Sequence, residues 1–182
     1  MWTKAGKQAL QTVAIWNATA NVNTAKPMFP NSSIRNTSNQ ERWVSYVNGN
    51  LFSNITIVTN ANQGIHIGSG ITTPTENDYK LGTQITSGFS ATSSNAVRGV
   101  DLDGKPYMEL TYTITNTGSA SMTISEMGIV TQNVWCCNTS TATSASSNQV
   151  LLDRTLLATP VTIEAGDSAA IKYRITCDMT FT

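Results

Sequence analysis

The chain has 182 residues, enough for one domain with a substantial core. Its 11 Lys and Arg residues balance 11 Asp and Glu residues, so neither a basic surface that collects phosphates nor a nucleic-acid partner is expected. No apolar run approaches the roughly eighteen residues that span a bilayer, so no membrane partner is expected either.

Residues 1–42 are predicted to form an N-terminal arm ahead of the main domain. Within it, residues 3–16 carry apolar side chains three and four positions apart, which indicates a short helix capped by Thr3. The alternative is an arm that becomes ordered only against a neighbouring chain. The segment 17–40, with its Asn, Thr and two prolines, is typical of a long irregular loop.

Such an arm buries too little apolar surface on its own to offset the entropy lost when it becomes ordered. The strands from residue 43 onward already account for a core, so the arm is predicted to pack on a neighbouring subunit. Its candidate subunit contacts are Trp2, Leu10, Val13, Trp16, Met28 and Phe29.

The main domain, residues 43–182, shows turn signals about every ten residues between short strand patterns. Strands are predicted at 43–47, 55–58, 64–68, 83–86 and 96–102, and a short helix at 74–81. Asn48-Gly49 is a hairpin signal. His66 alternates with two isoleucines and is expected to be an ordinary strand histidine, because the sequence supplies no nucleophile and orienting acid for catalysis.

The clearest pattern runs from Tyr107 to Val130 and predicts a β-hairpin. Apolar and threonine residues alternate up to Thr115, and turn residues follow at 116–119. The apolar phase changes after Glu126, which predicts a bulge that Gly128 would tolerate.

After this pattern comes a low-complexity segment at 132–149, which is predicted to be a surface loop. Within it, Trp135 is expected to contact either the core or a partner. A clean period-two pattern over 169–181 predicts a central strand. The three cysteines, Cys136, Cys137 and Cys177, do not suggest a disulfide framework. With one histidine in the chain, no metal or cofactor site is expected.

These patterns favour an all-β fold: a single antiparallel β-sandwich or jelly roll with an N-terminal arm or short helix. They also suggest one structural ion pair, between Glu126 and Arg154. Glu126 lies at the phase change, where its carboxylate could accept hydrogen bonds from backbone freed by the bulge, and Arg154 follows three largely apolar residues. We predict that the two are partners across strands, since a buried Arg–carboxylate pair fixes strand register.

Three short motifs occur in a recognisable order. They are Ile65-His-Ile-Gly-Ser-Gly70 with Thr73-Pro-Thr and Asp78-Tyr-Lys-Leu81, then Ile124-Ser-Glu-Met-Gly-Ile129, then Leu151-Leu-Asp-Arg154 with Pro160-Val-Thr-Ile163. This order resembles a diffuse group of small tailed-bacteriophage virion proteins. The segments 17–42 and 132–149 depart from that pattern.

The resemblance implies a non-enzymatic structural component of a virion, in the head, neck or tail. The implied partners are copies of the chain and neighbouring virion proteins, and no catalytic residue is carried over. The rival interpretation is a module that binds a host receptor or glycan through aromatic residues such as Trp43, Tyr46 or Trp135.

Overall fold

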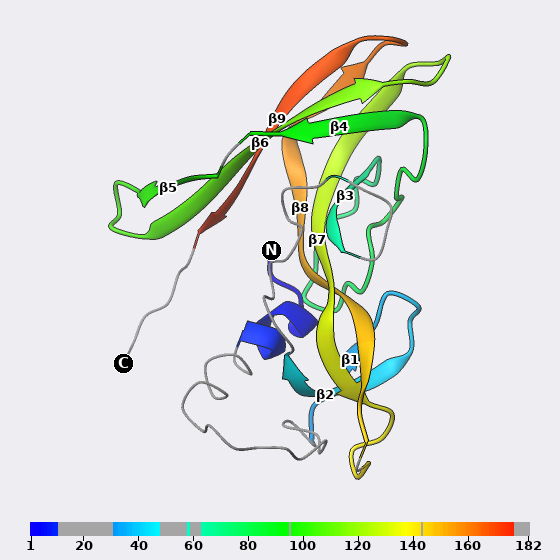
Figure 1. The fold of residues 1–182 in the computed structure, drawn as a ribbon, viewed down its shortest axis with the longest axis vertical. Helices are drawn as coiled ribbons and strands as arrows, with labels where there is room; N and C mark the ends of the chain where they lie inside the picture. Colours follow the sequence, from blue (N-terminus) through cyan, green and yellow to red (C-terminus); the bar gives the residue numbers. More distant parts are fainter. Residues whose placement is uncertain (11–30, 48–57, 59–62, 95, 143, 177–182) are drawn as a thin grey trace.

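The computed structural model describes residues 1–10, 31–47, 58, 63–94, 96–142 and 144–176. Its strands pair antiparallel in two curled sheets, with a short helix over residues 4–10 (Figure 1). The prediction of a sandwich-like all-β fold with a short N-terminal helix is confirmed. No helix among the described residues is long and apolar enough to cross a membrane.

The first sheet is organised around β7 (Met122–Cys137), which has three partner strands. It pairs with β8 (Ser146–Ile163) along most of its length, forming the long ribbon that follows the vertical axis of Figure 1. On its other side it pairs with β3 (Gly64–Gly68) and β2 (Glu41–Val47), and β1 (Ile34–Arg35) pairs with β2. Residues 34–42, predicted as part of the arm, therefore contribute to this sheet.

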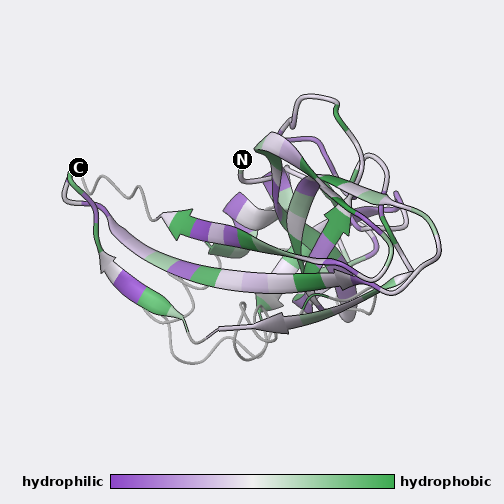
Figure 2. Ribbon diagram, turned by 90° about the horizontal axis from the view of Figure 1, so that it is seen from above, coloured by the Kyte–Doolittle hydropathy of each residue, from purple (hydrophilic) through white to green (hydrophobic). Residues whose placement is uncertain are grey.

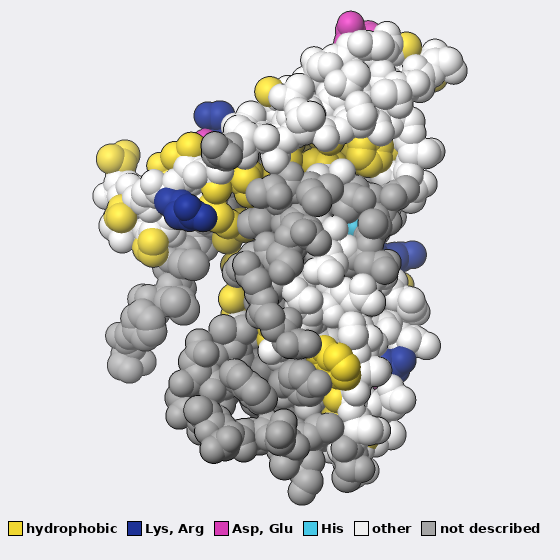
Figure 3. Space-filling model, in the orientation of Figure 1, with side chains coloured by type: hydrophobic (Ala, Val, Ile, Leu, Met, Phe, Trp, Pro, Cys, Tyr) yellow, Lys and Arg dark blue, Asp and Glu magenta, His cyan; other side chains and the backbone are white. Residues whose placement is uncertain are grey.

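The second sheet is organised around β6 (Pro106–Asn116). One side of β6 pairs with β4 (Phe89–Ser93) and β5 (Val97–Val100), and the other side pairs with β9 (Ser168–Thr176). Hydrophobic and hydrophilic residues alternate along these strands (Figure 2), as expected for a sheet with one buried face. Hydrophobic side chains also reach the surface near β5 (Figure 3).

One core lies between the two sheets. Leu110, Tyr112 and Ile114 of β6 are at most 1% exposed and belong to the same cluster as Ile65 and Ile129 of the first sheet. The Tyr173 hydroxyl donates a hydrogen bond to the buried Asp153 carboxylate, which links β9 to β8.

The predicted hairpin of residues 107–130 is not formed, because β6 and β7 belong to different sheets. The turn residues after Asn116 carry the chain from one sheet to the other. The buried Asn116 amide stabilises this crossing by donating to the carbonyls of Ala120 (2.8 Å) and Ile163 (2.9 Å). A period-two pattern identifies strands, but it does not identify the partner of each strand.

The irregularity predicted in β7 occurs, although not at Gly128. The register with β8 shifts between Ile124 and Glu126, whereas Gly128 pairs regularly with His66 and Arg154. Gly128 is required for packing, since a Cβ there would lie 2.8 Å from the Asp153 carbonyl oxygen.

Three further predictions about local structure are wrong. Residues 74–81 form a turn, not a helix, because Asp78 accepts hydrogen bonds from the backbone and hydroxyl of Thr75. Most of the predicted loop at 132–149 belongs to β7 and β8, whose pairing overrides its loop-like composition. The closing strand β9 lies at a sheet edge instead of the centre, since its only paired strand is β6 among the described residues.

Two predicted strands give a partial match. Residues 83–86 contribute an isolated bridge at Gln84, and the strand that follows them, β4, was not predicted. The hairpin around Asn48-Gly49 lies outside the described residues, apart from a bridge between Val58 and Ile65.

The first ten residues pack on their own domain. The Thr3 amide donates to the Leu152 carbonyl of β8 (3.0 Å), and the Thr3 hydroxyl accepts from the Gly6 amide (3.0 Å), which confirms Thr3 as the helix cap. Ala5 and Ala9 are buried in the core, and Trp2 and Leu10 pack against it.

Trp2 and Leu10 therefore contact this chain's own core, which corrects the prediction that they contact a neighbouring subunit. The helix covers a part of β8 that the strands leave uncovered, so the strands alone do not complete the core. Val13, Trp16, Met28 and Phe29 lie outside the described residues.

Candidate functional site

The structure brings Glu126 and Arg154 together. The Arg154 Nε lies 2.6 Å from Glu126 Oε2, and the side chains of the two residues are 3% and 0% exposed. The residues belong to β7 and β8, where Arg154 is opposite Gly128. The missing side chain at Gly128 lets Leu81 and Leu151 pack closely here, since a Cβ would lie 2.9 Å from each of them.

The rest of the Arg154 guanidinium binds the loop that follows β3. Its Nη1 lies 2.7 Å from Asp78 Oδ2, and its Nη2 donates to the carbonyl and the hydroxyl of Thr72 at 3.0 and 3.1 Å. The roles of Thr72 and Asp78 were not predicted from the sequence, because residues 74–81 were assigned to a helix.

The Glu126 carboxylate is held by three backbone amides of the same loop. Its Oε1 accepts from Gly70 (3.0 Å) and Thr83 (2.8 Å), and its Oε2 accepts from Gly82 (3.1 Å). These donors come from the loop over 69–83, not from backbone freed by a bulge as predicted. A Cβ at position 70 would lie 2.3 Å from Glu126 Oε1, so glycine is needed for this close approach.

The electrostatics of this network favour the ionised state of all three side chains. Burial raises the pKa of Glu126, but hydrogen bonds from Thr83, Arg154 and Gly82 outweigh that effect and hold the pKa below its usual value. The pKa of Asp78 is lowered in the same way, because bonds from Arg154 and Thr75 outweigh partial burial. Every contact described here is internal, so the network fixes the loop against the ribbon.

Acid is therefore expected to destabilise the domain through these two carboxyls. Their pKa values in the folded state lie below the ordinary 4.5 and 3.8, so the unfolded chain binds protons first as the pH falls. This contribution to the free energy of unfolding is complete above those ordinary values and is lost as the pH falls through the folded-state values. Urea titrations between pH 7 and pH 3 would measure the loss.

The matched control for the acid titration is Glu126→Gln, which removes one of the two ionisable groups. Its free energy of unfolding should be lower at neutral pH and should fall less steeply in acid. An identical acid response in the variant and the native chain would contradict this assignment.

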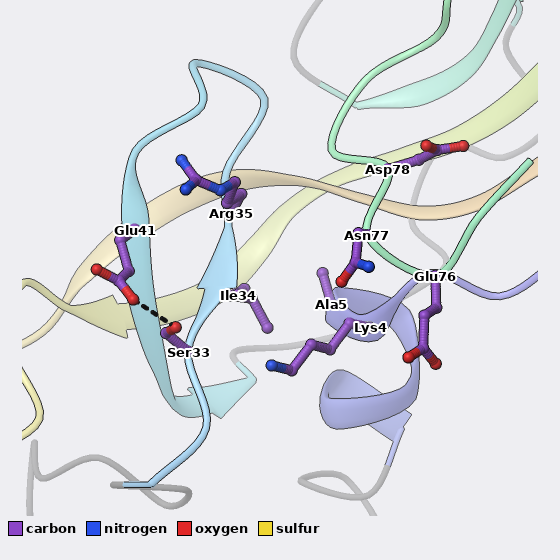
Figure 4. Close-up of a pocket in the computed structure, with 9 residues that line it drawn as sticks. All are labelled: Lys4, Ala5, Ser33, Ile34, Arg35, Glu41, Glu76, Asn77 and Asp78. Atoms are coloured by element: carbon purple, nitrogen blue, oxygen red, sulfur yellow. Dashed lines mark hydrogen bonds between the residues drawn. The ribbon is translucent and has the colours of Figure 1, made fainter.

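A groove of about 220 Å³ lies beside the network (Figure 4). Three separate segments line it: the helix at Lys4 and Ala5, residues 33–41 of the first sheet, and the turn at 76–78. Four of its five charged side chains make internal contacts, as Glu41 does with the Ser33 hydroxyl (2.6 Å). Lys7 bridges to Glu76 just outside the groove (2.8 Å). The Lys7–Glu76 ion pair joins the helix to the turn.

The remaining candidates are distributed over the first sheet. Trp135 is half-buried in β7, opposite Tyr46 of β2 and Ser147 of β8, so it is a strand residue and not the surface-loop contact that the sequence predicted. Cys136 and Cys137 are buried, and burial raises the pKa of the Cys136 thiol to about 12. Cys177 lies outside the described residues. Among the residues that the structure describes, no group of His, Cys, Asp and Glu is placed to hold a metal ion.

Comparison of the chain with protein-family models, curated proteins and solved structures gives no match.

Proposed function

We propose that this chain is a non-enzymatic structural component of a bacteriophage virion, in the head, neck or tail, that assembles with copies of itself and with neighbouring virion proteins. The observation that carries the proposal is a projecting hairpin with exposed apolar side chains. The order of the three sequence motifs, which resembles that of small virion proteins, supports it.

The hairpin joins β5 to β6 and contains Val97, Val100 and Leu102. These residues are 57%, 66% and 107% exposed, and they are three of the five large hydrophobic residues that are exposed in the described chain. Val97 and Val100 lie on opposite faces of β5, so neither face of the hairpin is fully covered. Apolar side chains concentrated in this way are typical of a surface that meets another protein.

The position of the hairpin makes it accessible to a neighbour. Among the described residues, β5 pairs only with the first residues of β6, and this part of the sheet projects from the side of the body in Figure 1. The same side of the space-filling view carries a group of hydrophobic side chains (Figure 3). A second copy of this chain is the occupant we favour, since a homo-oligomer offers the same apolar surface on both partners.

The motif residues support a structural role. Gly70, Glu126 and Arg154 belong to the motifs, and their contacts hold the loop over 69–83 against the β7–β8 ribbon. In this account the motif residues hold the scaffold together, and the surface around them contacts the neighbours.

The test is a triple variant with Val97→Thr, Val100→Thr and Leu102→Gln. Threonine keeps the β-propensity of β5, so the variant should fold with an unchanged melting temperature. We expect its mass in solution to fall toward that of a monomer and its incorporation into particles to drop. Light scattering and quantitative mass spectrometry of purified virions would measure these two results.

The control is Ile71→Thr, which removes an exposed apolar side chain (77%) from a loop away from the hairpin. It should leave mass and incorporation unchanged. A native chain that is monomeric at all concentrations and absent from particles would overturn the proposal.

A further inference from the structure

A second pocket, of about 310 Å³, is lined by residues of β3, β7 and β8 and of the segments around Ser38 and Lys80. Its apolar base is formed by Leu81 and Val130, which pack together with Leu151 in a small buried cluster. His66 of β3 also lines it and is only 6% exposed. The pocket is therefore built on rigid strands and a buried cluster.

The rim of this pocket is polar. Lys80, Gln84 and Ser38 contribute an ammonium, an amide and a hydroxyl. The segment containing Ser38 is held in place by Thr37, whose amide donates to the Gln149 carbonyl of β8 (3.0 Å) and whose hydroxyl bonds to the Gln149 amide oxygen (3.2 Å). Donors from two separate segments, one at Ser38 and one at residues 80–84, thus line the same pocket.

The charge on the side chains that line the pocket is positive. No Asp or Glu is among its lining residues, and Lys80 is their only permanently charged side chain. The described contact of the Lys80 ammonium is with the Tyr79 ring, 5.8 Å from its centroid, and not with a carboxylate. Outside the described residues, the sequence contains a single Asp or Glu, which is Asp178. An anionic ligand is favoured in such a field.

We propose that this pocket binds the oxyanion group of a small ligand, which is either a free inorganic anion or the acid group of a sugar. Lys80 pairs with the anion, and the Gln84 amide and Ser38 hydroxyl donate to its oxygens. The volume is at the lower end for ligand pockets and accommodates one anion or one sugar residue over the apolar base. This site is separate from the β5–β6 hairpin and does not depend on the assembly role.

The test uses the single histidine of the chain as a reporter, because it gives one imidazole signal in NMR spectra. The full chain is titrated at constant ionic strength with sodium sulfate, with N-acetylneuraminic acid and with neutral galactose. We expect saturable shifts of His66 and of the amides of residues 80–84 with one or both acidic probes, at dissociation constants on the order of 1 mM or tighter. Equal binding of both probes indicates recognition of the anion alone, and preference for the sugar acid indicates a glycan source.

The decisive variants are Lys80→Gln and Gln84→Ala, each of which should raise the dissociation constant, the first by about tenfold or more. Lys80→Arg should retain binding. The control Lys172→Gln removes an exposed lysine from β9 and should leave binding unchanged. Shifts that never saturate, galactose binding as strong as that of the acids, or full binding by Lys80→Gln would each overturn the proposal.

Discussion

Arg154→Ala is expected to lower the free energy of unfolding by about 3–5 kcal/mol, the cost of leaving a buried charge without its partner. The variant leaves the Glu126 carboxylate, which is 0% exposed, without its guanidinium, and it removes the ion pair of Asp78. Glu126→Ala should lower the free energy of unfolding by a similar amount, because it also leaves the backbone amides of Gly70, Gly82 and Thr83 without their hydrogen-bond acceptor. Chemical denaturation of each variant measures the effect.

A double-mutant cycle distinguishes the pair from general damage to the core. Replacing both residues should cost clearly less than the sum of the two single replacements, since each charge is unfavourable mainly when the other is missing. The exposed pair Lys7–Glu76 provides the control, and its cycle should show little coupling because water screens both charges. Additive costs at Glu126 and Arg154 would contradict the pairing.

Gly6→Ala is the second substitution with a large expected effect. A Cβ at this position would lie 2.0 Å from the Leu152 carbonyl oxygen of β8, a backbone atom that cannot move without distorting the strand. The helix must shift away, which uncovers Ala5 and Ala9 in the core. We expect a loss of about 3 kcal/mol, at the upper end of the range for overpacking.

Hydrogen exchange locates this loss. The Thr3 amide, bonded to Leu152, should exchange faster in the variant than in the native chain. Lys7→Ala, at an exposed position of the same helix, is the matched control and should change neither quantity much. Unchanged stability in Gly6→Ala would mean that the first ten residues do not dock on their own domain, which would restore the hypothesis of a contact with a neighbouring chain.

The alternation of apolar and polar residues predicted the strands well, because successive side chains of a strand point to opposite faces and only one face is buried. The strand over 64–68 and the first part of the strand ending at 176 are examples. Alternation did not reveal that β6 and β7 separate into two sheets. That choice depends on the Asn116 amide, whose partners at Ala120 and Ile163 come together only in the folded chain.

The site was predicted in part. The Glu126–Arg154 contact followed from two ionisable residues among apolar neighbours, which need a partner when they are buried. The contributions of Thr72 and Asp78 were not predicted, because they come from a loop whose position is fixed by those same contacts. Likewise, the composition of residues 132–149 indicated a loop, but the long pairing of β7 with β8 made most of it strand.

The central claim, that this chain is a repeated structural part of a virion, is tested most directly by electron microscopy of the purified particle. The account predicts density for the two-sheet domain at many symmetry-related positions, with the β5–β6 hairpin against a neighbouring copy. Particles that lack this density, or that carry the domain with Val97, Val100 and Leu102 facing solvent in every copy, would contradict it.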